Sequence, residues 1–439
     1  MTTSIPAHDD IRARRAWYIL AVLIVTTFAA SINRQILFLI VEPLKQEMSL
    51  SDADIGILTG LAPGILAGSG ALLLGWLTDR MPRHLLLAAC IVVWSVATAG
   101  LGLAYTFAGF LVGVLALALG ETALTPVANS LIPDVFAGRR RVLANLIFFA
   151  AGGIAVGMGT AFSGLLLRWV QENVISLPAL LQPLTYWRSA FMLVALAGIP
   201  VALLVLGIGH IRRRVASEAP EKAITSLGQY ARAHGIAATG LYAAIACTSF
   251  GGLAVMAWTP SYIIRLYGVS PADVGFALGI SSTLGGLLGA GLAALVITRL
   301  ITRYGVLAPR HLYKYAMLLT IVPALLQLYA TSVTQAYLLV AIQILLVNLG
   351  MALSSTMIQD ISPSTYRGRL FGISVLIVTL VSSVAPFIVG LISDQFGAEP
   401  RGLLWAILLV VVPALALSAL SIALTNRHYQ ITAANLAIN

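Results

Sequence analysis

The stretch Phe107–Ile132 reads FAGFLVGVLALALGETALTPVANSLI and contains a single charged residue, Glu121. At about 1.5 Å per residue, a helix of this length crosses a bilayer core of roughly 30 Å. An ionised carboxylate inside that core is costly unless it faces protein or water and has a partner. Glu121 is therefore either a neutral residue hydrogen-bonded between packed helices or a functional carboxylate that titrates or binds a ligand. The functional interpretation is the default at such a position.

The rest of the chain has the same character. Of its 439 residues 59% are hydrophobic and 10% are charged, which excludes an ordinary soluble domain. The N-terminal residues are polar, and the run after them is too long for a signal-peptide core, so we expect it to be the first span. The sequence predicts an all-α, polytopic membrane protein with twelve spans, at 17–41, 53–78, 84–105, 107–132, 142–167, 188–210, 237–264, 271–298, 314–331, 335–358, 368–392 and 402–425.

The net charge of +10 is distributed unevenly between the two sides of the predicted membrane. When the loops are numbered alternately from an inside N-terminus, 20 of the 26 Lys and Arg residues lie inside and 5 lie outside, while Arg34 lies within a span. Basic residues accumulate in cytoplasmic loops of membrane proteins. We therefore expect both termini to be cytoplasmic, and the basic charge indicates orientation rather than nucleic-acid binding.

The sequence predicts no cofactor and no metal site. Cys90 and Cys247 both lie within predicted spans without metal-ligand spacing, and the nucleotide-binding pattern G-x-x-x-x-G-K-[ST] does not occur. A membrane enzyme would need a nucleophile beside a base, or a His/Asp metal set, within the spans, and none is present. A channel is disfavoured because one asymmetric glutamate provides no ring of charge. A secondary transporter driven by gradients remains.

A motif after the second span supports that class. Gly75, Asp79, Arg80 and Arg83 form the pattern G-x-x-x-D-R-x-x-R. An aspartate at a helix C-terminus opposes the helix dipole, so we expect Asp79 to meet an arginine or the N-terminus of another helix. The pattern resembles the signature loop of the major facilitator superfamily, which implies two six-helix bundles.

An internal repeat agrees with this resemblance. Asp134 and Arg141 follow the fourth span, and Asp360 and Arg367 recur 226 residues later after the tenth. The repeat indicates two parallel halves. We predict a cytoplasmic tail at 1–16, six-helix bundles at 17–210 and 237–425, a central cytoplasmic loop at 211–236 and a second tail at 426–439. We assign a cytoplasmic gate to Gly75, Asp79, Arg80, Arg83, Asp134, Arg141, Asp360 and Arg367.

Arg34 is the second charge embedded in a span. Its guanidinium either snorkels outward or faces the interior, where it would seek a carboxylate, phosphate or sulfonate. We expect Arg34 outside the midplane and Glu121 slightly inside it, in one cavity but without necessarily touching. Asn33, Thr125 and Asn129 complete the predicted proton and substrate site.

Within the superfamily the chain resembles the spinster-like branch, which contains sphingolipid and lysolipid transporters and their bacterial relatives. That resemblance implies alternating access, amphiphilic substrates and, in bacterial members, proton-driven export. Two positions depart from the branch, because Asn33 replaces its aspartate and Val114 its arginine. The resemblance rests on 33–37 (Asn-Arg-Gln-Ile-Leu), 41–43 (Val-Glu-Pro), 50–52 (Leu-Ser-Asp), Trp94, Ser95, Gly120, Glu121, Pro126, Ser130, Trp187 and Arg188.

These observations predict a transporter of the bacterial inner membrane for an amphiphilic or organic-anion small molecule. We expect a monomer in the lipid bilayer, with protons coupled through Glu121. The alternative is a gradient-independent facilitator or lipid translocase in which Glu121 and Arg34 only bind substrate.

Overall fold

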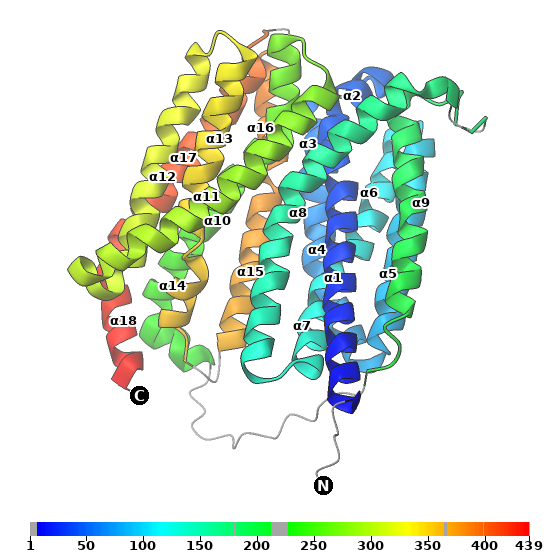
Figure 1. The fold of residues 1–439 in the computed structure, drawn as a ribbon. Helices are drawn as coiled ribbons and strands as arrows, with labels where there is room; N and C mark the ends of the chain where they lie inside the picture. Colours follow the sequence, from blue (N-terminus) through cyan, green and yellow to red (C-terminus); the bar gives the residue numbers. More distant parts are fainter. Residues whose placement is uncertain are drawn as a thin grey trace. The chain divides into compact units, whose positions relative to one another are not determined.

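The computed structural model describes residues 7–176, 178–179, 181–211, 227–363, 367–397 and 399–438. Over these residues every regular element is helical, from α1 (Ala7–Leu39) to α18 (Asn426–Ile438) (Figure 1). The described helices divide into two compact units. Unit 1 contains Met1–Leu37 and Leu66–Ser217, and unit 2 contains Phe38–Ile65 and Glu218–Asn439. The outer ends of the first two predicted spans thus belong to unit 2, and the predicted division into six-span halves stays a prediction.

Unit 1 is built around α5 (Arg83–Leu103), which packs against α6 (Phe107–Thr122) and lies beside α9 (Tyr186–Leu206) in Figure 1. Trp94, Trp187, Phe110 and Phe191 are fully buried. The unit also contains α1 up to Leu37, most of α4, and three further elements, which are α7 (Leu124–Val135), α8 (Gly138–Glu172) and η2 (Val174–Ser176). The fourth predicted span is therefore two helices that meet at Ala123, two residues after Glu121.

Unit 2 joins a short outer segment to the C-terminal helices. The outer segment contains α2 (Val41–Met48), α3 (Asp52–Gly56), the π-helical turn η1 (Ile57–Leu61) and the start of α4 (Ala62–Arg80). In the C-terminal part, α10 packs on α17, α11 on α13, and α12 on both α13 and α17. Its elements are α10 (Leu227–Tyr267), α11 (Pro271–Tyr304), η3 (Gly305–Leu307), α12 (Ala308–Leu326), η4 (Gln327–Tyr329), α13 (Val333–Met351), α14 (Ser354–Asp360), α15 (Arg367–Ser383), α16 (Ala385–Gln395), α17 (Gly402–Leu424) and α18.

Eleven described helical stretches are long and apolar enough to cross a membrane. One of them, Pro271–Tyr329, has 59 residues and contains both α11 and α12, which the sequence predicts as two spans. The predicted all-α polytopic architecture is thus confirmed. Two predicted polar segments need correction, because the loop 211–236 is helical from Leu227 and the tail 426–439 forms α18. Hydrophobicity marks only the part of a helix that lies in lipid, and neither segment contains a proline to end the helix within it.

Candidate functional site

Arg34 of α1 and Glu121 of α6 form an ion pair within unit 1. The Arg34 Nη2 and Nε atoms lie 2.6 and 3.1 Å from the same carboxylate oxygen, Oε2 of Glu121. The two side chains, which we expected to share a cavity, are thus in direct contact. The side chain of Arg34 is 59% exposed and that of Glu121 only 4%. The second carboxylate oxygen, Oε1, is buried and has no hydrogen-bond partner among the described residues.

The position of Glu121 depends on the glycine before it. A Cβ atom at Gly120 would lie 2.8 Å from the carbonyl oxygen of Cys90 and 2.9 Å from Cβ of Trp94. Only a residue without a side chain lets α6 approach α5 this closely. The close approach fixes the depth of Glu121 in the helix layer.

Asn33 has a structural contact next to the pair. Its Nδ2 donates to the carbonyl oxygen of Ala29 at 2.9 Å, and its Oδ1 accepts from the Thr98 hydroxyl at 2.6 Å. The residue is buried and ties α1 to α5 immediately before Arg34. Thr125 and Asn129 lie on α7 with exposed side chains, and no described contact joins either of them to Arg34 or Glu121.

Arg83 and Asp134, two of the predicted gate residues, form a buried ion pair in unit 1. The Arg83 Nη1 also donates to the carbonyl and hydroxyl oxygens of Ser130, both at 2.8 Å, and Nη2 donates to the carbonyl oxygen of Ile211 at 3.2 Å. All these partners lie in unit 1. Arg83 therefore holds the inner ends of the third, fourth and sixth spans together.

The other predicted gate residues of unit 1 are less constrained by described contacts. The Arg80 guanidinium stacks 3.9 Å above the Trp76 ring. The Arg141 side chain is exposed, and a Cβ atom at Gly75 would meet no atom within 4 Å. The side chain of Asp79 lies outside the described part of the structure, so its predicted contact stays a prediction.

Unit 2 repeats the buried arginine. Arg310 lies 227 residues after Arg83 and is fully buried. Its Nε donates to Asn426 Oδ1 at 2.8 Å, and its Nη2 donates to the Ile422 carbonyl and the Thr425 hydroxyl, both at 2.7 Å. Sequence reasoning missed Arg310, although the repeat that identified the aspartates points to within one residue of it.

Asp360 joins this inner end of unit 2 through an aromatic ring. The Tyr429 hydroxyl donates to Asp360 Oδ2 at 2.9 Å, and the Arg310 guanidinium lies 4.4 Å from the centre of the Tyr429 ring. Tyr429 belongs to α18, which the sequence analysis treated as a tail. The side chain of Arg367, the remaining predicted gate residue, is not among those described.

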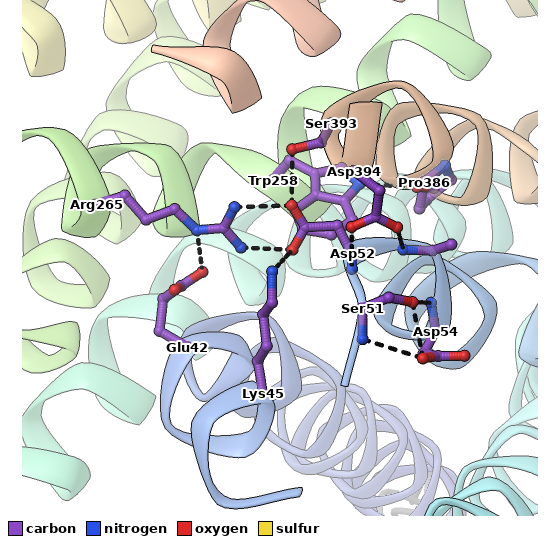
Figure 2. A network of polar contacts seen from close by, with 11 residues as sticks. Glu42, Lys45, Ser51, Asp52, Asp54, Trp258, Arg265, Pro386, Ser393 and Asp394 are labelled. Carbon is purple, nitrogen blue, oxygen red and sulfur yellow. Dashed lines mark hydrogen bonds and ion pairs between the residues drawn. The ribbon is translucent and has the colours of Figure 1, made fainter. Parts of the chain in front are cut away.

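A second group of charges, here called the outer cluster, lies in unit 2 and consists of Glu42, Lys45, Asp52, Arg265, Ser393 and Asp394 (Figure 2). At its centre the Arg265 guanidinium binds both oxygens of Asp52, at 2.7 and 2.8 Å, while its Nε donates to Glu42 Oε1 at 2.8 Å. Lys45 and the Ser393 hydroxyl donate to the same Asp52 carboxylate.

The carboxylates of this cluster differ in their surroundings. Asp394 of α16 accepts the backbone N–H groups of Asp52 and Ala53 at 2.8 and 2.9 Å, so it caps the N-terminus of α3. Burial raises the pKa of Glu42, and the charge of Arg265 opposes that shift. The sequence analysis quoted Glu42 and Asp52 for their resemblance but assigned them no role. Asking which acid partners the outer cation Arg265 would have identified the cluster.

Glycines bring the backbones of the outer segment and α16 together. A Cβ atom at Gly56 would lie 2.5 Å from the Phe387 Cα, and one at Gly60 would lie 2.6 Å from the Ser383 carbonyl oxygen. Gly56 and Gly60 are one turn apart, so both face α16. This small-residue packing and the outer cluster together attach Phe38–Ile65 to the C-terminal helices of unit 2.

Comparison with known proteins adds sequence evidence. A family model for the Major Facilitator Superfamily matches residues 23–293 and 282–433. The chain is 25% identical over 431 residues to an MFS-type efflux pump of Mycolicibacterium smegmatis, which covers 95% of this chain and 94% of the pump. It is 23% identical over 404 residues to Protein spinster of Drosophila melanogaster, with 89% of this chain and 64% of that protein covered.

Solved structures show the same fold. The crystal structure of a bacterial homologue of the human lysosomal transporter Spinster, inward-facing and unoccupied, matches with a TM-score of 0.78 at 19% identity, over 99% of this chain and 98% of that one. The nucleoside transporter NupG matches with a TM-score of 0.67 at 14% identity, over 93% of this chain and 98% of that one.

Proposed function

Because the chain belongs to the Major Facilitator Superfamily, we propose that it is a secondary active transporter that exchanges an amphiphilic or organic-anion small molecule for, or moves it with, protons at Glu121. The family, the all-helical polytopic fold and the likeness to spinster proteins were predicted from the sequence and are confirmed. Membrane transport of a small molecule, rather than enzyme chemistry, follows from the family.

The Arg34–Glu121 pair is the observation that supports proton coupling. Glu121 uses one carboxylate oxygen for Arg34, while its buried second oxygen lacks a partner among the described residues. A proton on that carboxylate would neutralise it and release the exposed guanidinium of Arg34 for another anion. Protons and an anionic head group would therefore bind cooperatively, whereas protons and a cationic head group would compete for Glu121.

Alternating access is part of the same proposal. Phe38–Ile65 continues at both ends into unit 1 helices, yet the outer cluster binds it to α10 and α16. If the two predicted halves separate at one end at a time, these bonds must break when the outer end opens. The pairs Arg83–Asp134 and Tyr429–Asp360 each lie within one unit, so we assign them to keeping the inner end of each half rigid.

The location and assembly in this proposal come from the charge distribution and the family. The excess of basic residues in the loops numbered as inside supports cytoplasmic termini and insertion in the bacterial inner membrane. We propose that the chain acts as a monomer in the bilayer.

A facilitator or lipid translocase without proton coupling is the second candidate. The observation in its favour is Asn33, which replaces the acid of the spinster-like branch. Both polar atoms of the Asn33 amide bind Ala29 and Thr98, so this position supplies no second titratable group beside Glu121.

The decisive experiment is Glu121→Gln in proteoliposomes. A thermal-shift screen of amphiphiles on the purified protein first identifies a transported compound. With that compound, Glu121→Gln should abolish transport driven by a pH gradient but retain exchange without a gradient, since exchange needs no net proton movement. Glu172→Gln, at an exposed outer carboxylate, is the matched control and should behave as wild type.

Each other outcome has a distinct meaning. Loss of both activities would indicate that Glu121 binds a cationic part of the substrate. Wild-type behaviour in both assays would show that Glu121 is structural, and pH-independent transport by the unmutated protein would favour the facilitator.

A further inference from the structure

Unit 2 contains a cavity of about 550 Å³ between the first turns of α10 and the ends of α17 and α18. Small residues of α10 explain its shape. A Cβ atom at Gly240 would lie 2.5 Å from the Thr425 hydroxyl oxygen, so the helices touch there, whereas one at Gly235 would meet no atom within 4 Å. The helices therefore diverge from Gly240 toward Gly235, and the space between them stays open.

The lining of the cavity favours an anion. It includes the basic side chains Arg232, His234 and His428 and several hydroxyl groups, and no Asp or Glu is among its residues. His234 Nδ1 lies 3.2 Å from the Thr432 hydroxyl oxygen, which orients the imidazole at the edge of the cavity. Arg232 and His428 are exposed and come from facing helices. A phosphate between them would meet donors from both sides.

The surroundings of the cavity are apolar. Ile236 and Ile431, both in its lining, are 59% and 51% exposed, and neighbouring Leu424 is 71% exposed. The predicted seventh span starts at residue 237 and the predicted twelfth ends at 425, so the cavity lies at the predicted inner boundary of the membrane. A ligand here would place its charge beside the basic groups and its hydrocarbon along the exposed apolar side chains.

We propose that this cavity binds the phosphate head group of an anionic phospholipid from the cytoplasmic leaflet. Basic pockets between spans on the cytoplasmic side are suited to such head groups, because the surface potential of anionic lipid adds to the direct contacts. The site is separate from the Arg34–Glu121 pair and lies wholly in unit 2. It would therefore hold a resident lipid rather than transported substrate.

The test compares two lipids with identical acyl chains, dioleoyl phosphatidylglycerol and dioleoyl phosphatidylcholine, on the purified full-length protein. Native mass spectrometry should show one saturable site that prefers phosphatidylglycerol. Each basic residue near an anionic surface contributes roughly a fivefold gain in affinity. The variant Arg232→Gln/His428→Gln should therefore bind phosphatidylglycerol about 25-fold more weakly and lose the preference.

Arg299→Gln is the matched control, since it removes an exposed arginine from the same unit on the same predicted side. This control should retain the preference, and a photoreactive phosphatidylglycerol should crosslink within 231–243 or 421–432. Equal affinity for both lipids, equal losses in control and double variant, or crosslinks confined to other segments would each overturn the proposal. Full protection by inorganic phosphate alone would overturn the lipid assignment.

Discussion

Removing the charge of Asp52 should destabilise unit 2, and the cost can be estimated from its contacts. The side chain is 3% exposed and accepts two hydrogen bonds from Arg265, one from Lys45 and one from Ser393. Asp52→Asn keeps the volume but leaves three charge-assisted bonds without their anion. The substitution also leaves the Asp52 backbone N–H free to donate to Asp394.

Loss of one partner of a buried ion pair costs about 3–5 kcal/mol. Arg265 keeps Glu42 at 2.8 Å, and Lys45, 28% exposed, can turn toward water, so the lower end applies. We therefore expect Asp52→Asn to lower the free energy of unfolding by about 3 kcal/mol. Combined with Arg265→Gln, it should cost less than the two single changes together, with a coupling of about 2–3 kcal/mol.

The measurement is a double-mutant cycle of reversible unfolding in mixed micelles, followed by tryptophan fluorescence. Arg401→Gln, at an exposed arginine outside the cluster, is the control and should change stability by less than about 0.5 kcal/mol. If the single changes add to within about 0.5 kcal/mol, Asp52 and Arg265 are not energetically coupled and the outer cluster does not hold the segment.

Two other contacts give predictions of their own. Gly120→Ala should cost about 1–3 kcal/mol and reduce transport, because the new methyl group meets the Cys90 carbonyl oxygen; a stable and fully active variant would show that α6 does not need this close approach. Tyr429→Phe removes the hydroxyl that binds Asp360 and should lower the unfolding free energy by about 1–3 kcal/mol, measured as above, whereas an unchanged value would mean that water replaces the bond.

The sequence predicts the elements of this protein better than their contacts. Hydrophobic runs of the right length locate the spans, because the cost of burying polar groups in lipid dominates every other term. The same cost makes Glu121 and Arg34 conspicuous. Their direct pairing, however, depends on how closely α1 and α6 approach, which is set by small residues such as Gly120 whose role shows only in three dimensions.

The outer cluster escaped prediction for a related reason. Glu42, Asp52 and Arg265 lie at the ends of spans, where charged residues are common and carry no energetic penalty that marks them. Arg265 is more than 200 residues from its partners, so no local pattern indicates the pairing. The helices beyond the membrane, such as α18, were missed because a polar helix has no hydropathy signal.

The π-helical turn η1 has a consequence for how the second span responds to load. The boundary between units falls at Ile65, directly after η1 and the pair Pro63 and Gly64. A π turn and a proline each weaken the regular hydrogen-bond ladder, so bending there costs less than in an uninterrupted α-helix. The first span crosses its boundary at Leu37 within the unbroken helix α1. The two connections between the units are therefore unequal in stiffness, one compliant and one rigid, and strain should concentrate in the second span.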